Sequence, residues 1–523
     1  MPYDPPPHTT QHWSVTKPGA TGRRGMVVSQ SRDAALAGIA ILDAGGNAVD
    51  AAVGTALALA TVEPWNSGLG GIGFAVIHRA GQPAAETVDF GPVAPAGLRP
   101  DAFRLTGRMK QDLFAWPEVE GDANIHGPLS FAIPSAVAGY AHMHGRWGVL
   151  PFTDVMAPAL ALARRGLPQD WFTTLKIANA AAVLARYPSS AAIYLPGGLP
   201  PVAPYQGVPG YFQLGNLPDT LAHLAKAGLR DFYEGDVAAT LAADFAAIGS
   251  LLTADDLRRC EARVVPATEV EWHGRTIQLA TGLTAGPTFV RVLEAMRDVP
   301  RGAAPDAAWF ASFARAMKAA YAERLASLGE TEPKAAESCT THLTVCDADG
   351  TMIAVTTTLL SSMGSRVVLP RSGVLMNNGV MWFDPRPGQP NSAAPGKRPL
   401  TNMCPVIVRD SSGPMLAGGA SGGRRILAAV AQALAFTLDF AMEPSAAAHY
   451  PRIDVSDPSY VTADARLTTD VLDRLHADGV VEVVDHGVLP VNFACPNFIV
   501  KSDGRLTGIS DAMSPWSAAV AQA

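Results

Sequence analysis

Hydrophobic and polar residues alternate along residues 338–347, so that odd-numbered and even-numbered side chains fall on opposite faces. A period of two is typical of a β-strand. The polar, Gly-containing stretch at residues 347–350 predicts a turn, and residues 351–358 form a second run rich in β-branched residues. These features predict a β-hairpin whose open end brings Thr340 and Thr358 together. Threonine is common in β-sheets, so the pairing by itself indicates ordinary sheet residues and not catalytic ones.

Helical patterns flank this hairpin in the sequence. Ser31 begins one predicted helix, which ends at the glycine pair 45–46. Asn47 caps the next helix, and Asp50 is placed to complement its exposed N–H groups. A long Ala-rich helix is predicted over residues 307–328. Because strand-like and helical segments alternate on both sides of the hairpin, the sequence fits an α/β protein built as one intertwined unit.

Residues 68–73 satisfy the GxGxxG pattern that dinucleotide-binding folds use. Such a fingerprint must follow a strand and open a helix. Here helical sequence precedes the glycines, and the strand-like residues 74–78 follow them. Close packing of the backbone is therefore the better explanation of these glycines.

The composition limits the choice of partner and compartment. Of the 523 residues 48% are hydrophobic, which is ample for a large core. The net charge of −7 and the pI near 5.9 argue against nucleic acid or an anionic membrane as a partner. Five cysteines without a CxxC pair imply no disulfide framework. Residues 1–25 lack an apolar core of signal-peptide length, and the apolar run 48–62 is too short to cross a bilayer. We therefore expect a cytoplasmic protein.

A threonine hydroxyl is a poor nucleophile unless a base lies within hydrogen-bond distance. On its own hairpin Thr340 has only His342 as a nearby candidate. A free α-amine on Thr340 itself would supply the base, because its pKa of about 7.7–8.0 leaves part of it neutral near neutral pH. This arrangement requires cleavage of the bond between Cys339 and Thr340, which periodicity alone does not establish.

Residues 419–423 contain a second candidate nucleophile, because they satisfy GxSxG with Ser421 at the centre. A strand before this segment and a helix after it would form the nucleophile elbow of an α/β-hydrolase. Asp454 or Asp470, followed by His486, would complete a triad in the order Ser, Asp, His. Against this alternative, the motif lies unusually late in the chain, and no HGGG-type loop precedes it.

Five short segments of the chain together carry a resemblance to a known family. They are GGNAVDAA at residues 45–52, EPWNSGLGG at 63–71, TTH at 340–342, PGKRPL at 395–400 and GGRRI at 422–426. In this order they resemble the γ-glutamyltranspeptidase family of self-cleaving enzymes with an N-terminal nucleophile. The resemblance implies an α/β fold, the αββα sandwich of N-terminal nucleophile hydrolases, formed by two chains from one precursor. It also implies a large subunit of residues 1–339 and a small subunit of residues 340–523 that begins at the nucleophile.

The resemblance assigns the chemistry to four positions. Thr340 would supply both the hydroxyl nucleophile and the amine base, and Thr358 would orient the nucleophile. The backbone N–H groups of Gly422 and Gly423 would stabilise the developing oxyanion. Acyl transfer to water needs only these groups, so no metal or organic cofactor is expected.

The expected partners are a small-molecule amide substrate and the second cleaved subunit, with a dimer of such heterodimers left open. Nucleic acid and membrane are not expected as partners. A non-enzymatic alternative is a binding protein that kept the fold and lost the chemistry. The retained threonines and glycines argue against it.

Positions at which the family binds its γ-glutamyl substrate have changed. Where the resemblance implies Arg, Asn, Gln and Asp, this chain has Gly91, Leu360, Gly379 and Trp382. Each lost buried charged partner is worth roughly 2–5 kcal/mol, so little basis remains for binding γ-glutamyl compounds. The pattern is closer to relatives that hydrolyse small acid amides such as oxamate, and the bulky Trp382 predicts a small pocket.

Such an acid amide still needs a cation for its carboxylate. Arg366 is the predicted cation, and Thr401 and Asn402 would add neutral hydrogen bonds to the same carboxylate. Two alternatives stay open within the family: a γ-glutamyl hydrolase or transferase, and a β-lactam (cephalosporin) acylase.

Overall fold

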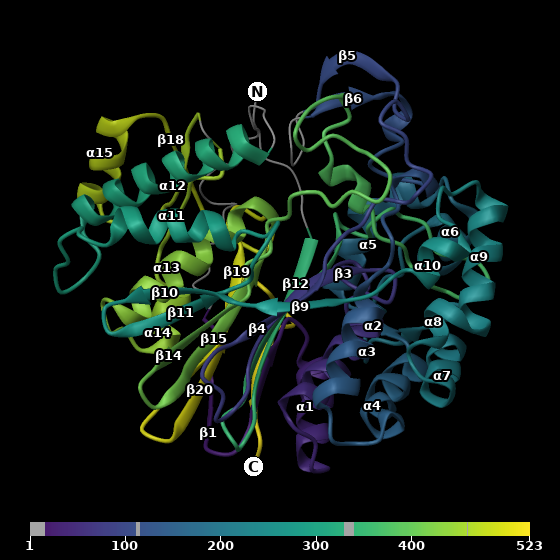
Figure 1. Cartoon of the computed structure of the whole chain (residues 1–523), viewed down its shortest axis with the longest axis horizontal. Helices are drawn as coiled ribbons and strands as arrows, with labels where there is room; N and C mark the ends of the chain where they lie inside the picture. The colour runs from purple at the N-terminus through teal and green to yellow at the C-terminus, as the bar shows by residue number, and fades with distance from the viewer. Residues whose placement is uncertain (1–15, 111–115, 329–338, 458) are drawn as a thin grey trace.

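Two seven-stranded sheets lie face to face between two layers of helices, as Figure 1 shows. This computed structural model describes residues 16–110, 116–328, 339–457 and 459–523. Much of the N-terminal segment 1–25, on which the expected absence of a signal peptide rests, lies outside the described residues. The layer order confirms the predicted αββα sandwich.

Strands from both halves of the chain build each sheet. The first sheet has the order β21 (Ala518–Ala521), β2 (Met26–Ser29), β12 (Cys339–Cys346), β13 (Met352–Leu360), β3 (Ile72–His78), β4 (Glu86–Phe90) and β9 (Arg263–Pro266). The second has the order β1 (Ala20–Gly22), β20 (Arg505–Ser510), β19 (Cys495–Ser502), β15 (Gly413–Ser421), β14 (Val406–Asp410), β11 (Arg275–Leu279) and β10 (Thr268–Trp272). All neighbouring strands within these two sheets are antiparallel.

One helical layer covers each sheet. Over the first sheet lie α1 (Arg32–Asp43), α2 (Ala48–Val62), α3 (Ala136–Trp147) and α4 (Phe152–Arg165), with α5 (Trp171–Leu184), α6 (Pro188–Tyr194), α7 (Leu217–Ala227), α8 (Asp231–Glu234), α9 (Asp236–Ile248) and α10 (Ala254–Arg258) on the same side (Figure 1). Over the second sheet lie α11 (Gly286–Met296), α12 (Ala307–Leu328), α13 (Ile426–Leu438), α14 (Pro444–His449) and α15 (Thr469–Asp478). The bounds of α12 coincide with the helix predicted over residues 307–328.

The predicted hairpin is confirmed as β12 and β13. Their register pairs Thr341 with Thr357, and the ladder is irregular between Cys339 and Thr341. A bulge of this kind re-aims the side chain that it releases from the regular pairing. The extra residue lies on β13, where Thr358 and Leu359 are opposite the single residue Thr340, so Thr340 lacks the regular cross-strand partner of an ordinary sheet threonine.

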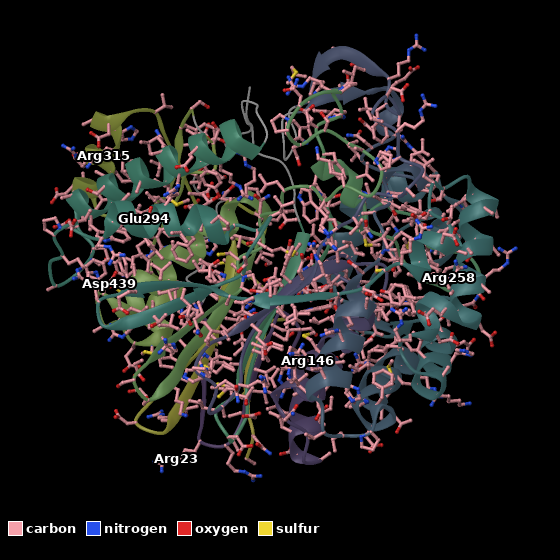
Figure 2. The ribbon with its side chains drawn as sticks, viewed as in Figure 1. Arg23, Arg146, Arg258, Glu294, Arg315 and Asp439 are labelled. Carbon is pink, nitrogen blue, oxygen red and sulfur yellow. The ribbon has the colours of Figure 1, made fainter. Side chains whose placement is uncertain are left out.

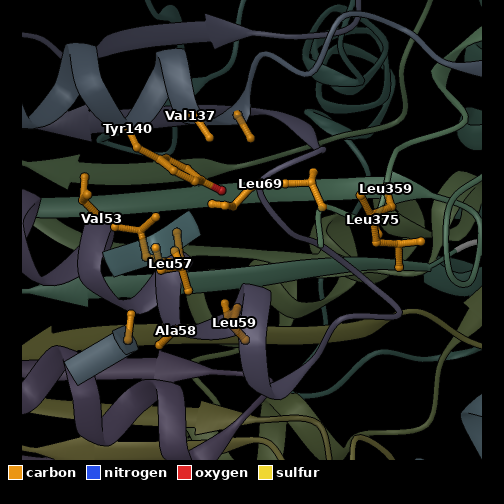
Figure 3. Close-up of a cluster of buried hydrophobic side chains, with 14 of the residues drawn as sticks. Val53, Leu57, Ala58, Leu59, Leu69, Val137, Tyr140, Leu359 and Leu375 are labelled. Carbon is orange, nitrogen blue, oxygen red and sulfur yellow. The ribbon is translucent and has the colours of Figure 1, made fainter. Parts of the chain in front are cut away.

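Helix α2 is the central helix of its layer, and every residue from Ala48 to Val62 is buried. Its N-terminus has the predicted cap: the Asn47 side chain accepts from the N–H groups of Val49 and Asp50, and the Asp50 carboxylate accepts from the Asn47 N–H. Figure 3 shows Val53 and Leu57 of this helix packed beside the strands of the first sheet. Burial on all sides anchors α2, so the segment that follows it is held firmly against β13.

Of the four glycines in residues 68–73, Gly70, Gly71 and Gly73 are confirmed as packing residues, whereas a Cβ on Gly68 would meet no atom within 4 Å. A Cβ on Gly70 would lie 2.2 Å from the carbonyl oxygen of Leu375, and one on Gly73 would lie 2.4 Å from that of Thr356. Because β3 follows these glycines and α2 precedes them, the order of elements is the reverse of a dinucleotide fingerprint. The close approach instead lets β3 pair with β13 next to Thr358.

Charged side chains lie mainly on the outer faces of the helical layers, as the labelled Arg258, Glu294 and Arg315 show in Figure 2. Exposed ion pairs of this kind contribute little to stability. Among the described residues, no helix combines the length and the apolar character that a membrane span requires.

His342 lies between the two sheets and is completely buried. Its Nδ1 lies 2.9 Å from Thr356 Oγ1 and its Nε2 lies 3.2 Å from Thr344 Oγ1. The ring also contacts β15 closely, because a Cβ on Gly419 would lie 2.3 Å from ring atom Cε1. Burial lowers the pKa of His342 to about 3, so it is a neutral structural residue and not the base that Thr340 requires.

This burial predicts a specific loss of stability in acid. The unfolded chain protonates His342 near its ordinary pKa of 6.5, whereas the folded chain resists protonation down to about 3. Stability should therefore fall as the pH drops below about 6.5, with this group contributing up to about 1.4 kcal/mol per pH unit. Urea unfolding of wild type and His342→Asn at pH 7.5 and pH 5 measures this contribution. An equal loss of stability in both proteins between the two pH values would contradict it.

Candidate active site

The two threonines predicted to meet at the open end of the hairpin do so. Thr340 Oγ1 donates to Thr358 Oγ1 over 3.4 Å, and Thr358 Oγ1 also accepts from the backbone N–H of Leu360 over 2.7 Å. Thr340 is 4% exposed and Thr358 is fully buried. The Leu360 N–H fixes the Thr358 hydroxyl, which can then orient the hydroxyl of Thr340.

Two glycines follow the end of β15, and the first of them, Gly422, lines the same cavity as Thr340, whereas Gly423 does not line it. Gly422 and Gly423 have φ values of +136° and +63°, and Gly423 begins the short 3₁₀ helix η6 (Gly423–Arg425) that leads into α13. Neither backbone N–H donates to a carbonyl among the described residues. Because both glycines precede a helix, these donors are suited to an anion. A side chain on Gly422 would also collide with Ala494, whose Cα would lie 2.7 Å from the added Cβ.

Thr340 and Gly422 line one cavity of about 280 Å³. Its wall includes three ionisable side chains that come from separate elements: Glu63 after α2, Lys176 on α5 and Arg425 in η6. An apolar segment, residues 488–491, forms another part of the wall. The volume is close to the lower end of the range for small-molecule sites and exceeds what oxamate alone needs. The predicted small pocket is therefore larger than expected, and Trp382 is not among the residues that line it.

The two cations of the cavity differ in how firmly they are held. Arg425 donates from Nη1 to the carbonyl oxygen of Val491 and from Nε to that of Gly422 over 3.4 Å. These bonds make Arg425 part of the loop structure around Gly422. Lys176 has its ammonium group 5.2 Å from the ring centre of Phe172. Lys176 is thus the cation with more freedom to bind a ligand carboxylate.

Glu63 is buried in the same wall. Its Oε1 accepts from Asn66 Nδ2 over 2.7 Å. Burial raises the pKa of Glu63 to about 7, although the Thr341 hydroxyl, Lys176 and Asn66 act in the opposite direction. A carboxyl group that titrates near neutral pH beside a candidate nucleophile is unusual for a purely structural residue.

The sequence did not single out these three side chains. Glu63 lies within the family-like segment 63–71 and Arg425 within segment 422–426, so both stood inside recognised motifs without an assigned role. Lys176 had no local signal, because it lies in the middle of an otherwise ordinary helix.

Arg366, Thr401 and Asn402 do not line the cavity that contains Thr340. The guanidinium of Arg366 donates to Ser361 Oγ over 2.8 Å and to the Gly364 carbonyl over 2.6 Å. Thr401 Oγ1 donates to the Leu283 carbonyl over 2.9 Å. The Asn402 side-chain oxygen lies 3.4 Å from Arg324 Nη2. These contacts bind all three to their own surroundings, and the structure does not bring them together with Thr340 as a carboxylate site.

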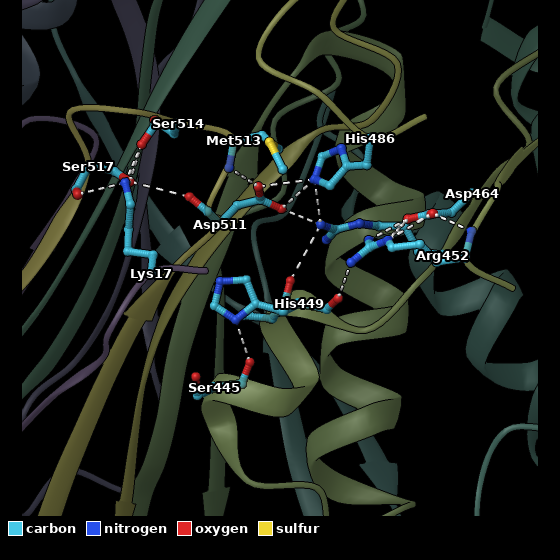
Figure 4. A network of polar contacts seen from close by, with 12 residues as sticks. Lys17, Ser445, His449, Arg452, Asp464, His486, Asp511, Met513, Ser514 and Ser517 are labelled. Atoms are coloured by element: carbon cyan, nitrogen blue, oxygen red, sulfur yellow. Dashed lines mark hydrogen bonds and ion pairs between the residues drawn. The ribbon is translucent and has the colours of Figure 1, made fainter. Parts of the chain in front are cut away.

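Ser421 lines the cavity, but among the described residues its hydroxyl has no hydrogen bond to a histidine or a carboxylate. Its hydroxyl accepts a hydrogen bond from Gln30 Nε2. The histidine of the hypothetical triad, His486, has its Nε2 3.1 Å from Asp511 Oδ1 and 3.2 Å from Arg452 Nη2 (Figure 4). His486 therefore belongs to a buried ionic network, not to a triad with Ser421.

The aspartates of that alternative lie elsewhere as well. The carboxylate of Asp454 accepts from Ser456 Oγ over 2.5 Å, and Asp470 lies in the first turn of α15. The two central sheets are antiparallel, whereas α/β folds with helices on both faces of one sheet use mostly parallel strands. The α/β-hydrolase alternative is therefore wrong.

Within the described part of the chain, no group of three or more His, Cys, Asp or Glu side chains is arranged to hold a metal ion. The chemistry available to the cavity is that of a hydroxyl, a carboxyl group, two cations and backbone donors. This set suits acyl transfer, in which a hydroxyl attacks a carbonyl and N–H groups stabilise the oxyanion.

Comparison with known proteins agrees with this chemistry. The family profile described as gamma-glutamyltranspeptidase matches residues 34–339 and 330–521. The chain is 30% identical to the acylase ACY 1 proenzyme of Pseudomonas sp. (strain V22), over 86% of this chain and 85% of the relative. It is 28% identical to the glutathione hydrolase proenzyme of Escherichia coli (strain K12), over 94% of this chain and 91% of the relative.

The fold has a close counterpart among solved structures. Cephalosporin acylase from Bacillus halodurans superposes with a TM-score of 0.83 at 24% identity, covering 100% of this chain and 99% of that one. Sandwich, motifs and family profile thus agree over nearly the whole chain. The chain therefore belongs to the γ-glutamyltranspeptidase family and is an amidohydrolase of its N-terminal nucleophile type.

Proposed function

We propose that Thr340 first cuts the Cys339–Thr340 bond of its own chain and then hydrolyses an amide through an acyl-enzyme. The observation that carries this proposal is the 3.4 Å contact between the hydroxyls of Thr340 and Thr358 in a cavity that Gly422 also lines. Cleavage converts the peptide nitrogen of Thr340 into a free amine, which supplies the missing base. The naming of two relatives as proenzymes supports the same sequence of events.

The catalytic steps follow from these groups. The Thr340 hydroxyl attacks the amide carbonyl while its proton moves to the α-amine, and the N–H groups of Gly422 and Gly423 stabilise the oxyanion. The resulting ammonium returns the proton to the leaving nitrogen as the carbon–nitrogen bond breaks. Water, activated by the same amine, then hydrolyses the ester.

The two cleavage products, residues 1–339 and 340–523, should remain one particle. In the first sheet β12 of the second product pairs with β2 of the first, and β13 pairs with β3. In the second sheet β14 pairs with β11, again across the two products. Separating the subunits would break both sheets and expose their shared core, so we expect a stable heterodimer.

The substrate is proposed to be an amide whose acyl group carries a carboxylate, of which oxamate is a small example. The cations available for this carboxylate are Lys176 and Arg425, which replace Arg366 in this role. Recognition of a γ-glutamyl group is disfavoured. Leu360 and Trp382 are buried in an apolar cluster with Phe74, and a side chain on Gly91 would lie 2.5 Å from the Phe74 ring.

A β-lactam side-chain acylase is the second candidate. Two observations favour it: the cavity is larger than oxamate requires, and residues 488–491 give it an apolar wall. The similarity to an acylase proenzyme points in the same direction. A longer dicarboxylic acyl group would satisfy both the apolar wall and the cation.

Substitution of Lys176 tests whether this lysine binds the carboxylate of the substrate. Lys176→Met should raise KM for a carboxylate-bearing amide by about 10- to 100-fold with little change in kcat, because a charged hydrogen bond to the substrate is lost in ground and transition states alike. At a pH well above 7, where Glu63 is ionised with or without Lys176, a neutral amide of equal length should be hydrolysed as before. Steady-state kinetics on oxamate, a glutaryl amide, a neutral amide and a γ-glutamyl anilide measure this.

The matched control is Lys226→Met, which removes a lysine from α7. It should leave all four substrates unaffected. Equal losses on neutral and carboxylate-bearing amides would show that Lys176 does not read the carboxylate. Fast turnover of the γ-glutamyl anilide would overturn the substrate assignment while leaving the nucleophile in place.

A further inference from the structure

One oxygen of the Glu63 carboxyl group, Oε2, is buried and has no hydrogen-bond donor in regular geometry among the described residues. The residue is 3% exposed and lines the cavity together with Thr340. Asn66 donates to Oε1, whereas no described donor meets Oε2 in regular geometry. The buried Thr341 hydroxyl is a nearby group that favours the ionised carboxyl, and its own oxygen also lacks a partner in regular geometry. A buried carboxylate oxygen without a partner is costly to a folded protein, which indicates that a donor occupies this position at some stage of function.

Two backbone hydrogen bonds hold the segment that contains Glu63 against the end of β13. The Leu359 N–H donates to the Asn66 carbonyl over 2.8 Å, and the Met363 N–H donates to the Trp65 carbonyl over 2.9 Å. These bonds join the segment that follows α2 to the end of β13, directly beside Thr358. Glu63 is therefore built into the same strand end that orients Thr340.

The groups that face Glu63 come from several elements. Lys176 of α5, Arg425 of η6 and the Cys495 thiol of β19 line the same cavity, and Asn66 and Thr341 lie next to the carboxyl group. Lys176 is a cation and favours the carboxylate over the neutral acid. The cavity thus supplies a carboxylate acceptor that can be ionised near neutral pH.

We propose that Glu63 is the positioning residue for the α-amine of Thr340, accepting a hydrogen bond from that amine at Oε2. This inference rests on the proposed self-cleavage, because the amine exists only after the cut. An N–H of the neutral amine donates to the carboxylate, which directs the nitrogen lone pair toward the Thr340 hydroxyl. When the hydroxyl attacks the substrate, its proton moves to the amine, and the carboxylate offsets the new positive charge. The ammonium then gives this proton to the leaving nitrogen, and Glu63 remains ionised throughout.

The pH profile of turnover tests this role. In wild type the active form needs an ionised Glu63 and a neutral amine, so log(kcat/KM) should fall with a slope of about two below neutral pH. Glu63→Gln should lower kcat roughly 10²-fold at pH 8 and reduce that slope to about one. The midpoint of the acid limb should also move to lower pH in this variant, because the Glu63 carboxylate, which raises the pKa of the Thr340 amine, is absent.

Rates are expressed per cleaved chain, with the cleaved fraction measured by intact mass. Glu443→Gln removes an exposed carboxylate at the start of α14 and serves as the control, which should keep the slope of about two. An unchanged slope and midpoint in Glu63→Gln would overturn the positioning role and leave the proposed function standing. A wild-type chain that neither cleaves nor turns over would overturn both.

A second variant covers the case in which Glu63→Gln prevents cleavage. Asn66→Ala keeps the carboxyl group but removes the hydrogen bond that favours its ionised form. The acid limb of the profile should then move to higher pH. An acid limb at the wild-type position in cleaved Asn66→Ala would also overturn the positioning role.

Discussion

Replacing Thr340 by alanine is expected to leave the 523-residue chain uncut and without amidase activity. The variant lacks the hydroxyl that attacks the carbonyl of Cys339, so the amine that serves as base is never released. Any chain cut by other means would still lack the nucleophile. Loss of a nucleophile that acts as a unit with its base typically costs about 10⁴- to 10⁶-fold in turnover.

Denaturing electrophoresis and intact-mass analysis of freshly purified protein measure the cleavage. Wild type should give residues 1–339 and 340–523, and Thr340→Ala a single chain. Ser421→Ala is the matched control, because it removes a hydroxyl from the same cavity without touching Thr340. It should cleave and retain most of its turnover.

Two outcomes would contradict this expectation. Cleavage that persists unchanged in Thr340→Ala would show that another group cuts the chain. A wild-type protein that stays intact after long incubation would favour the alternative of a binding protein that kept the fold and lost the chemistry.

Gly422→Ala should lower turnover by roughly 10²- to 10³-fold per cleaved chain, the usual consequence of losing one oxyanion donor. The added Cβ would lie 2.7 Å from the Cα of Ala494, which is backbone and cannot move aside cheaply. The φ of +136° is also unfavourable for alanine. The loop must therefore shift, and its N–H groups move away from the position where the oxyanion forms.

Gly413→Ala separates this effect from simple backbone strain. Gly413 begins the same strand, β15, at a φ of +118°, and a Cβ there would meet no atom within 4 Å. Both variants bear the strain of a positive φ, but only Gly422 lines the cavity. Melting temperatures should fall in both, whereas kcat should fall only in Gly422→Ala. Equal kcat values in the two variants would remove Gly422 from the oxyanion site.

Local sequence signals predicted the parts of the structure that depend on neighbours in the chain. The hairpin of β12 and β13, the Asn47 cap of α2 and the bounds of α12 depend on side-chain period and capping over a few residues. The meeting of Thr340 and Thr358 is of the same kind, because a single turn connects their strands. The bulge that sets Thr340 apart from the ladder carried no sequence signal.

The substrate contacts had no such local basis. The charge of Arg366 and its short distance from Thr358 along the chain predict that it binds the substrate carboxylate. In the structure its backbone has a φ of +63°, and its guanidinium donates to Ser361 and Gly364. Both bonds use Nη1 of Arg366, and the residue does not line the cavity that contains Thr340. Its position along the chain indicates that Arg366 lies near the end of β13, but it does not indicate which groups its guanidinium contacts.

The sequence by itself determined the hairpin that carries the candidate nucleophile Thr340, because a hairpin depends on periodicity and on one turn. The sandwich fold followed from the family resemblance of short motifs. Only the tertiary structure decided which charges surround that nucleophile. Glu63, Lys176 and Arg425 meet because the end of α2, the middle of α5 and the end of η6 converge on one cavity. They are separated by more than one hundred residues along the chain, and burial and charge act through space, so no local pattern could have joined them.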